Sequence, residues 1–338
     1  MVDDRFNTHM EYKSSILKSQ SWYFTDLDDS RLNITPPYPN SNNVSTDPNN
    51  PNRIIVGGGQ VTDNGDVRTL FEIETNTPYS ETRLVFDHIK AKAQKAIMTE
   101  TDWTNFEVTL YGEFINPNSN SEIGIYGRSG KHVLGRPCEG TYYRVVLRVD
   151  GSIRCDAKHW HPGGLFTLDP NAGGLGDLEG MRIGIKFIVF TNKDGETVTV
   201  RVMVDMLGDN TWTEMCYVID TGDHNNLAFL KCGDETTKVI THGGPLIGVE
   251  VRNFPENGFA IDKMSVREID ALSPKVEIPV PTVTIDPTMY ISPPTTPPST
   301  GIRPDIVEDD DWDDDDWTGG GTHGLPTWGD PGDNVIPP

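Results

Sequence analysis

The stretch YYRVVLRVDGSIRCDAKHW (142–160) decides the fold that we expect for this chain. It contains two runs of Val, Ile and Tyr interspersed with charged residues, and a turn dipeptide Asp-Gly at 150–151 separates them. A three-residue loop pairs Leu147 with Cys155 and gathers the apolar side chains on one face, whereas a two-residue loop would place apolar residues opposite charged ones. The stretch therefore predicts an antiparallel hairpin with one apolar face.

The opposite face of this hairpin is charged. It carries Arg144, Arg148, Arg154, Asp156, Lys158 and Trp160. A strand alternates its side chains between two faces, so these residues share one side of the sheet. Two interpretations stay open, namely a solvated charged face and a ligand-binding sheet.

Similar runs recur on both sides of the hairpin. They are FEVTLYGEFI (106–115), RIGIKFIVF (182–190) and TVTVRVMVDML (197–207), with a further Asp-Gly turn at 194–195. One segment, FDHIKAKAQKAIM (86–98), has the spacing of a short surface helix. The pattern predicts an all-β fold, an antiparallel two-sheet sandwich over residues 53–270.

The net charge excludes several classes of partner. The chain has 338 residues and a formal charge of −23, from 51 acidic and 28 basic residues. Such a chain is repelled by nucleic-acid phosphates and anionic lipid, so we expect no nucleic-acid partner. No run approaches the roughly 18 apolar residues of a membrane helix, so we expect no membrane insertion.

The two ends differ from the middle in composition. Residues 1–52 are rich in Asn, Pro, Asp and Ser and predict an N-terminal arm with a strand or two. Residues 271–338 contain 13 prolines and 13 acidic residues but only Lys275 and Arg303 as basic ones. This composition is typical of a disordered tail, but Trp312, Trp317 and Trp328 are costly to leave in water, so we expect this acidic tail to dock within an assembly. Its Asp run makes diffuse calcium binding possible, and we expect no other cofactor.

Two quoted segments resemble a known family. GIYGRSGKH (124–132) and CEGTYYRVVLRVDGSIRCDAKHWHPGG (138–164) are similar to microbial concanavalin A-like or laminin-G-like surface domains. The resemblance covers about residues 100–270. It implies a concanavalin A-like jelly roll and an extracellular or virion-surface location, and it implies no particular activity.

The four cysteines contain no CxxC pair, which argues against a zinc site. Within the region of resemblance, Cys138 and Cys232 both precede strand-starting segments, so we expect them to pair, which leaves Cys155 with Cys216. Buried free thiols are the alternative.

A ligand groove is predicted beside the glycine-flanked segments at 127–132 and 158–164. Its candidate residues are Tyr126, Arg128, His132, Arg144, Lys158, His159, Trp160, His161 and Arg252. Aromatic rings stack on sugars, and cations pair with sugar carboxylates or sulfates. We therefore expect a non-catalytic surface or virion structural protein with a glycan-binding β-sandwich, whose partners are glycans or neighbouring structural chains.

The alternative is a polysaccharide lyase or glycoside hydrolase that acts on acidic glycans. A lyase needs a cation on the uronate carboxylate and a proton-transfer group, for which Arg128, His132 and the His159–His161 strand are candidates. A hydrolase needs two nearby carboxylates, and Glu113 and Glu250 each stand alone in the sequence. We expect binding rather than catalysis.

Overall fold

The computed structural model describes ten segments of the chain. They are residues 3–14, 20–35, 43–57, 60–61, 67–75, 102–130, 141–158, 165–169, 172–223 and 239–271. Within these segments the regular structure is entirely β, and none contains a helix able to cross a membrane.

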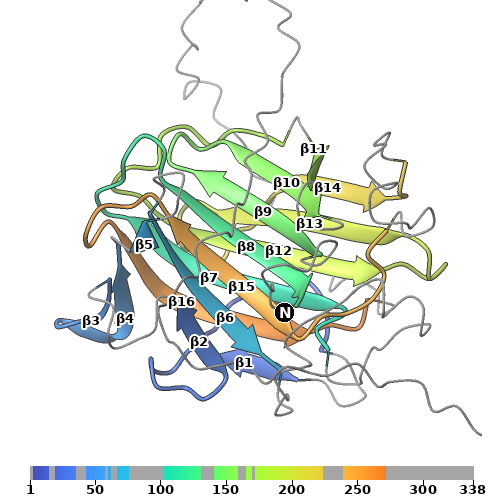
Figure 1. Ribbon diagram of the computed structural model, residues 1–338, viewed down its shortest axis with the longest axis horizontal. Helices are drawn as coiled ribbons and strands as arrows, with labels where there is room; N and C mark the ends of the chain where they lie inside the picture. The colour runs from blue at the N-terminus through green and yellow to red at the C-terminus, as the bar shows by residue number, and fades with distance from the viewer. Residues whose placement is uncertain are drawn as a thin grey trace, which may run out of the picture.

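The strands form two sheets that stack face to face (Figure 1). In spatial order, sheet A contains β14 (Thr213–Asp220), β13 (Val198–Asp205), β12 (Arg182–Thr191), β7 (Phe106–Phe114), β16 (Phe259–Glu268), β4 (Asn50–Val56) and β3 (Val44–Asp47), and β1 (Ser21–Tyr23) also pairs with β16.

Sheet B has the same number of strands. In spatial order it contains β11 (Leu165–Asp169), β10 (Ile153–Lys158), β9 (Tyr142–Arg148), β8 (Glu122–Ser129), β15 (Leu246–Arg252), β6 (Val67–Glu74) and β2 (Leu32–Thr35), and β5 (Gln60–Val61) also pairs with β6. Every strand pair in both sheets is antiparallel.

The predicted antiparallel two-sheet sandwich is confirmed. The five runs expected to be strands correspond to β7, β9, β10, β12 and β13. Their alternate apolar residues meet in one core between the sheets, where Phe106, Phe187 and Tyr143 are fully buried. The Asp194-Gly195 turn joins β12 to β13, and Gly195 adopts the positive φ of 72° that such a turn requires.

The hairpin of β9 and β10 keeps the predicted faces but not the predicted register. Leu147 lies opposite Ile153 rather than Cys155, and the loop is residues 149–151. The offset from the predicted pairing is two residues, so every side chain stays on its expected face. The register changes because Gly151, with φ of 80°, closes the loop one residue earlier.

Part of the N-terminal region belongs to the sandwich. Strands β1, β2 and β3 precede residue 53 and pair with β16, β6 and β4. Residues 3–14, named here the N-terminal segment, lie against the outer face of sheet A through Ser265 and Lys263 of β16. The predicted helix at 86–98 and the acidic tail lie outside the described residues.

Candidate functional site

The outer face of sheet B carries a cluster of aromatic and charged side chains. Its members, named here the outer cluster, are Tyr126 on β8, Tyr142 and Arg144 on β9, Asp156 and Lys158 on β10, and Glu250 on β15. The strand register explains the grouping, because Tyr126 pairs with Arg144, which pairs with Asp156. The predicted charged face of the hairpin is therefore real, although its central members are buried rather than solvated.

A buried ion pair holds the centre of the cluster. Arg144 donates from Nη2 to Oδ2 of Asp156 at 2.9 Å, and both side chains are almost completely buried. Arg154 donates to the same carboxylate oxygen at 3.0 Å from a side chain that is 30% exposed. Burial opposes the charge of Arg144, but Tyr142 and Asp156 outweigh it and raise the pKa of Arg144 above its ordinary value. One carboxylate therefore serves two guanidinium groups.

An aromatic pair lies beside this ion pair. The rings of Tyr126 and Tyr142 are 5.8 Å apart, and the Lys158 ammonium lies 5.7 Å from the Tyr142 ring centre. Gly248 makes this arrangement possible, because a Cβ at that position would lie 1.9 Å from a ring carbon of Tyr126. Burial raises the pKa of Tyr142 to about 12, so its hydroxyl stays protonated at neutral pH.

Glu250 is the unusual member of the cluster. Its side chain is buried, and Oε1 has no hydrogen-bond partner. Burial raises the pKa of the Glu250 carboxyl above its ordinary value. The alternation of β15 places Glu250 on the polar face, but only the three-dimensional arrangement shows that its Oε1 is left without a hydrogen-bond partner.

Arg128 was expected to line the groove, but its side chain is buried elsewhere. A bulge in the pairing of β8 with β15, together with a φ of 58° at Arg128, turns its side chain in between the sheets. There the guanidinium donates to the carbonyls of Thr104, at 2.9 Å, and Ile240, and to Oγ1 of Thr191 at 2.9 Å. Burial lowers the pKa of Arg128 to about 10. Its role is to tie loops to the end of the core.

Arg252 also lies away from the groove. It pairs with Glu122, whose strand neighbour is Arg148, whereas Lys158 is level with Tyr142 at the other end of β9. Six residues of strand separate these two levels, about 20 Å. His132, His159, Trp160 and His161 lie outside the described residues, so their convergence stays a prediction.

Of the two predicted cysteine pairs, only Cys155 with Cys216 lies within the described residues, and it is not a disulfide. Cys155 and Cys216 are buried free thiols that face each other from opposite sheets. A hydrogen bond with Cys216, followed by burial, raises the pKa of the Cys155 thiol well above its ordinary value. Proximity alone does not make a disulfide, because the bond also requires oxidation and a defined dihedral geometry. Cys138 and Cys232 lie outside the described residues.

The carboxylates of the outer cluster are too far apart for the usual hydrolase pair. Asp156 and Glu250 lie three strands apart, which corresponds to about 14 Å at the usual strand spacing. Glycosidase carboxylates are roughly 5–10 Å apart. Within the ten described segments, acidic, His and Cys side chains form no group of three that could hold a metal ion. The cluster is suited to hydrogen bonding and ring stacking.

Comparisons with known proteins give resemblances in architecture. No family model matches the sequence, and no curated protein matches it. The calcium- and Man3GlcNAc-bound exoplasmic/lumenal domain of VIP36 is 10% identical, with 73% of this chain and 93% of that chain covered and a TM-score of 0.39. A legume lectin-like domain from Entamoeba histolytica is 7% identical, with coverage of 71% and 91% and a TM-score of 0.37. Winged bean acidic lectin with methyl-α-D-galactose is 10% identical, with coverage of 75% and 100% and a TM-score of 0.32.

Proposed function

We propose that this chain is a non-catalytic carbohydrate-binding surface protein, and that an acidic glycan contacts the outer cluster of sheet B. The observation that carries the proposal is the grouping of two tyrosine rings with Arg144, Arg154 and Lys158 on one face. Sugar recognition uses this combination, because rings contact the apolar face of a pyranose and guanidinium groups bind carboxylates or sulfates in a fixed geometry.

The accessible part of the site is its edge. Arg154 is 30% exposed, and Thr167 on the edge strand β11 is exposed and donates to Asp156. Arg144 and Asp156 lie behind them and are buried, so they fix the position of Arg154 rather than contact a polymer directly. An anionic group of the glycan would bind at Arg154, and the sugar ring would contact the exposed edges of Tyr126 and Tyr142, each of which is 8% exposed.

The geometry favours binding over catalysis. The lyase alternative assigned the carboxylate-neutralising cation to Arg128, which is buried between the sheets. The hydrolase alternative needs a carboxylate pair that Asp156 and Glu250 do not form. Among the described residues, this removes Arg128 from the lyase hypothesis and the Asp156–Glu250 pair from the hydrolase hypothesis.

A glycan-binding assay on two matched variants tests the proposal. Arg154→Ala should weaken binding to uronate or sulfated glycans at least tenfold. Arg182→Ala on sheet A removes an arginine of similar exposure, 37%, that is also ion-paired to a carboxylate, and it should leave binding unchanged. If no glycan binds, or if both variants bind like the parent chain, the proposal fails.

We further propose that the chain works in an extracellular or virion-surface assembly. The support is its composition, in which an acidic tail with three tryptophans follows a domain of net negative charge. Calcium would bind diffusely to the Asp run of that tail. Removal of residues 276–338 should abolish assembly while the sandwich keeps its thermal stability.

A further inference from the structure

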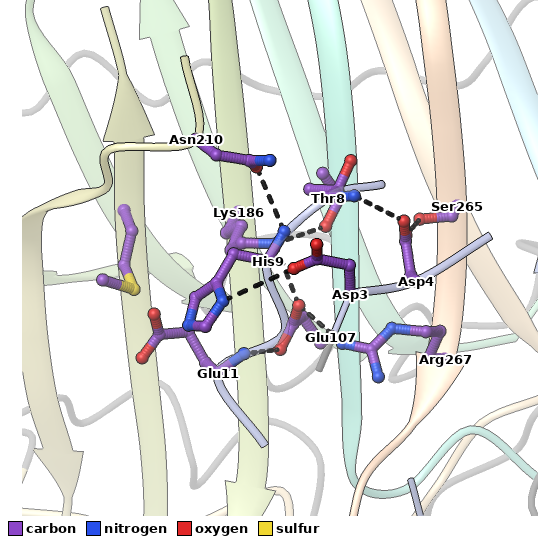
Figure 2. A network of polar contacts seen from close by, with 12 residues as sticks. Asp3, Asp4, Thr8, His9, Glu11, Glu107, Lys186, Asn210, Ser265 and Arg267 are labelled. Atoms are coloured by element: carbon purple, nitrogen blue, oxygen red, sulfur yellow. Dashed lines mark hydrogen bonds and ion pairs between the residues drawn. The ribbon is translucent and has the colours of Figure 1, made fainter. Parts of the chain in front are cut away.

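The N-terminal segment covers a charged region of sheet A. Beneath it, Lys186 lies 3.0 Å from Oε1 of Glu107, and Arg267 lies 2.7 Å from the same oxygen (Figure 2). The backbone amide of Glu11 donates to Oε2 of Glu107 at 3.2 Å. All three charged side chains on the sheet are almost completely buried, so the segment closes this region off from solvent.

The segment also adds negative charge to this face. Arg201, Lys186 and Arg267 share two carboxylates of the sheet, those of Glu107 and Glu214. The remaining negative charge comes from the segment. Its Glu11 carboxylate lies 3.7 Å from Arg201, and its Asp4 carboxylate acts on Lys186. These three cations therefore pair with only two sheet carboxylates, so the region beneath the segment favours an acidic occupant.

One arginine contacts two successive residues of the segment. Arg201 lies beside the Glu11 carboxylate, and its Nη1 donates to the Tyr12 hydroxyl at 3.0 Å. The Tyr12 ring fills a small apolar cluster that is separate from the main core. That cluster is formed by Ile188, Phe190, Met203 and Ile269. The segment thus sits on the sheet like a bound peptide, anchored by an acidic residue followed by an aromatic one.

The acidic tail repeats this pair of residues. Its sequence EDDDWDDDDW (308–317) contains Asp311-Trp312 and Asp316-Trp317. We propose that the face of sheet A around Arg201 is a docking site for such an acidic–aromatic pair, and that segment 308–317 of a second copy competes there with Glu11 and Tyr12. The proposal deepens the assembly role and is independent of glycan binding on sheet B.

The N-terminal segment is held in a way that permits exchange. Nε2 of His9, Oε1 of Glu11 and Nη1 of Arg267 are buried without hydrogen-bond partners, and Nδ1 of His9 lies 3.8 Å from the Asp3 carboxylate. Each such group has lost its hydration without gaining a hydrogen bond, and opening the interface restores that hydration. Opening the segment requires only that Tyr12 leaves its small apolar cluster, which is separate from the main core, so it costs less than global unfolding. An acidic tail would therefore compete with an N-terminal segment whose buried polar groups are not all hydrogen-bonded.

Sedimentation velocity on full-length variants tests the exchange. Tyr12→Ala removes the anchor of the N-terminal segment and should promote self-association at concentrations at least tenfold lower than the parent chain requires. Adding Trp312→Ala and Trp317→Ala, or Arg201→Gln, should reverse this. Tyr217→Ala is the matched control, because that ring also lies beside Arg201, at 5.9 Å, but is half exposed on the edge strand β14.

Three results would overturn the proposal. One is a folded Tyr12→Ala variant that associates no more than the parent chain, and another is association that persists without the tail tryptophans. The third comes from a labelled peptide of residues 306–319. If it binds the Tyr12→Ala variant in an Arg201-dependent way while the chain stays monomeric, the tail occupies its own copy. If Tyr12→Ala unfolds, Glu11→Gln provides the same test with a smaller change, and circular dichroism verifies the fold.

Discussion

The Arg144 guanidinium and the Asp156 carboxylate meet at 2.9 Å on neighbouring strands of sheet B, and hardly any of either side chain is exposed. The side chains at these register positions point to the outer face of the sheet, where charged residues are usually solvated. A buried ion pair is expensive to break, because removal of one partner leaves the other charge uncompensated. This relationship makes the outer cluster a rigid platform.

Asp156→Asn should therefore destabilise the chain by about 3–5 kcal/mol, because Arg144 would remain buried without its counter-charge. Urea unfolding followed by tryptophan fluorescence measures the difference. Arg154→Ala is the control, since it removes the partly exposed arginine from the same carboxylate and should cost no more than about 1 kcal/mol. Equal losses for the two variants would contradict the assigned burial.

Glu107→Gln should be similarly harmful on sheet A, by about 3–5 kcal/mol, because two buried cations share this carboxylate. Burial opposes ionisation of Glu107, but Lys186 and Arg267 outweigh it and lower the pKa of the carboxyl. The stabilisation from the charge is therefore complete above the unfolded-state pKa, about 4.3, and disappears as the pH falls through the lower folded-state value. A loss below about 1 kcal/mol at pH 7 would contradict the assignment.

Glu250→Gln should increase the free energy of unfolding at neutral pH, whereas Glu107→Gln lowers it. Burial raises the pKa of Glu250, so the folded chain holds the proton more tightly than the unfolded chain does. Its favourable contribution is present below the unfolded-state pKa and disappears as the pH rises through the folded-state value. At pH 7–8 the variant should be more stable than the parent chain by about 1–3 kcal/mol, and the gain should vanish near pH 4.

The control for Glu250 lies on the same face. Burial opposes ionisation of Glu122, but Arg252 and other cations lower the pKa of this carboxyl, so Glu122→Gln should destabilise at pH 7. Thermal unfolding of both variants between pH 4 and pH 8 gives the comparison. The same sign for both at pH 7 would refute the electrostatic account.

Cys155 and Cys216 should resist alkylation at pH 8 until the chain is unfolded, because both are buried and the Cys155 thiol has a raised pKa. Iodoacetamide labelling followed by mass spectrometry is the measurement, in a chain with Cys138→Ser and Cys232→Ser. Fast labelling of the native chain would show that this end of the sandwich is open.

The outer cluster was only partly predictable. The alternation of 142–160 indicated that Arg144, Asp156 and Lys158 share a face, because that depends only on the two-residue period of a strand. The burial of these side chains could not be predicted, since it depends on parts of the chain distant in sequence. Glu250 looked isolated in the sequence, although β15 places it near Gly124.

The positions of Arg128 and Arg252, the two arginines assigned to the groove, could not be predicted from local sequence either. Arg128 follows Tyr126 by two residues and should share its face, but a bulge and a positive φ rotate it into the core. Arg252 was placed near Lys158, but the antiparallel register puts them at opposite ends of the strands. Neither the bulge nor the long-range register has a local sequence signal.

The sequence by itself determined the all-β class, the five strand positions tested and the inward faces of β9 and β10, because each follows from local periodicity and turn chemistry. Only the tertiary structure decided which charges are buried, that Oε1 of Glu250 lacks a hydrogen-bond partner, and that Glu11 and Tyr12 lie on Arg201. Residues 190 positions apart meet there, and a contact of that kind is set by the packing of the whole domain rather than by the propensities of the residues involved.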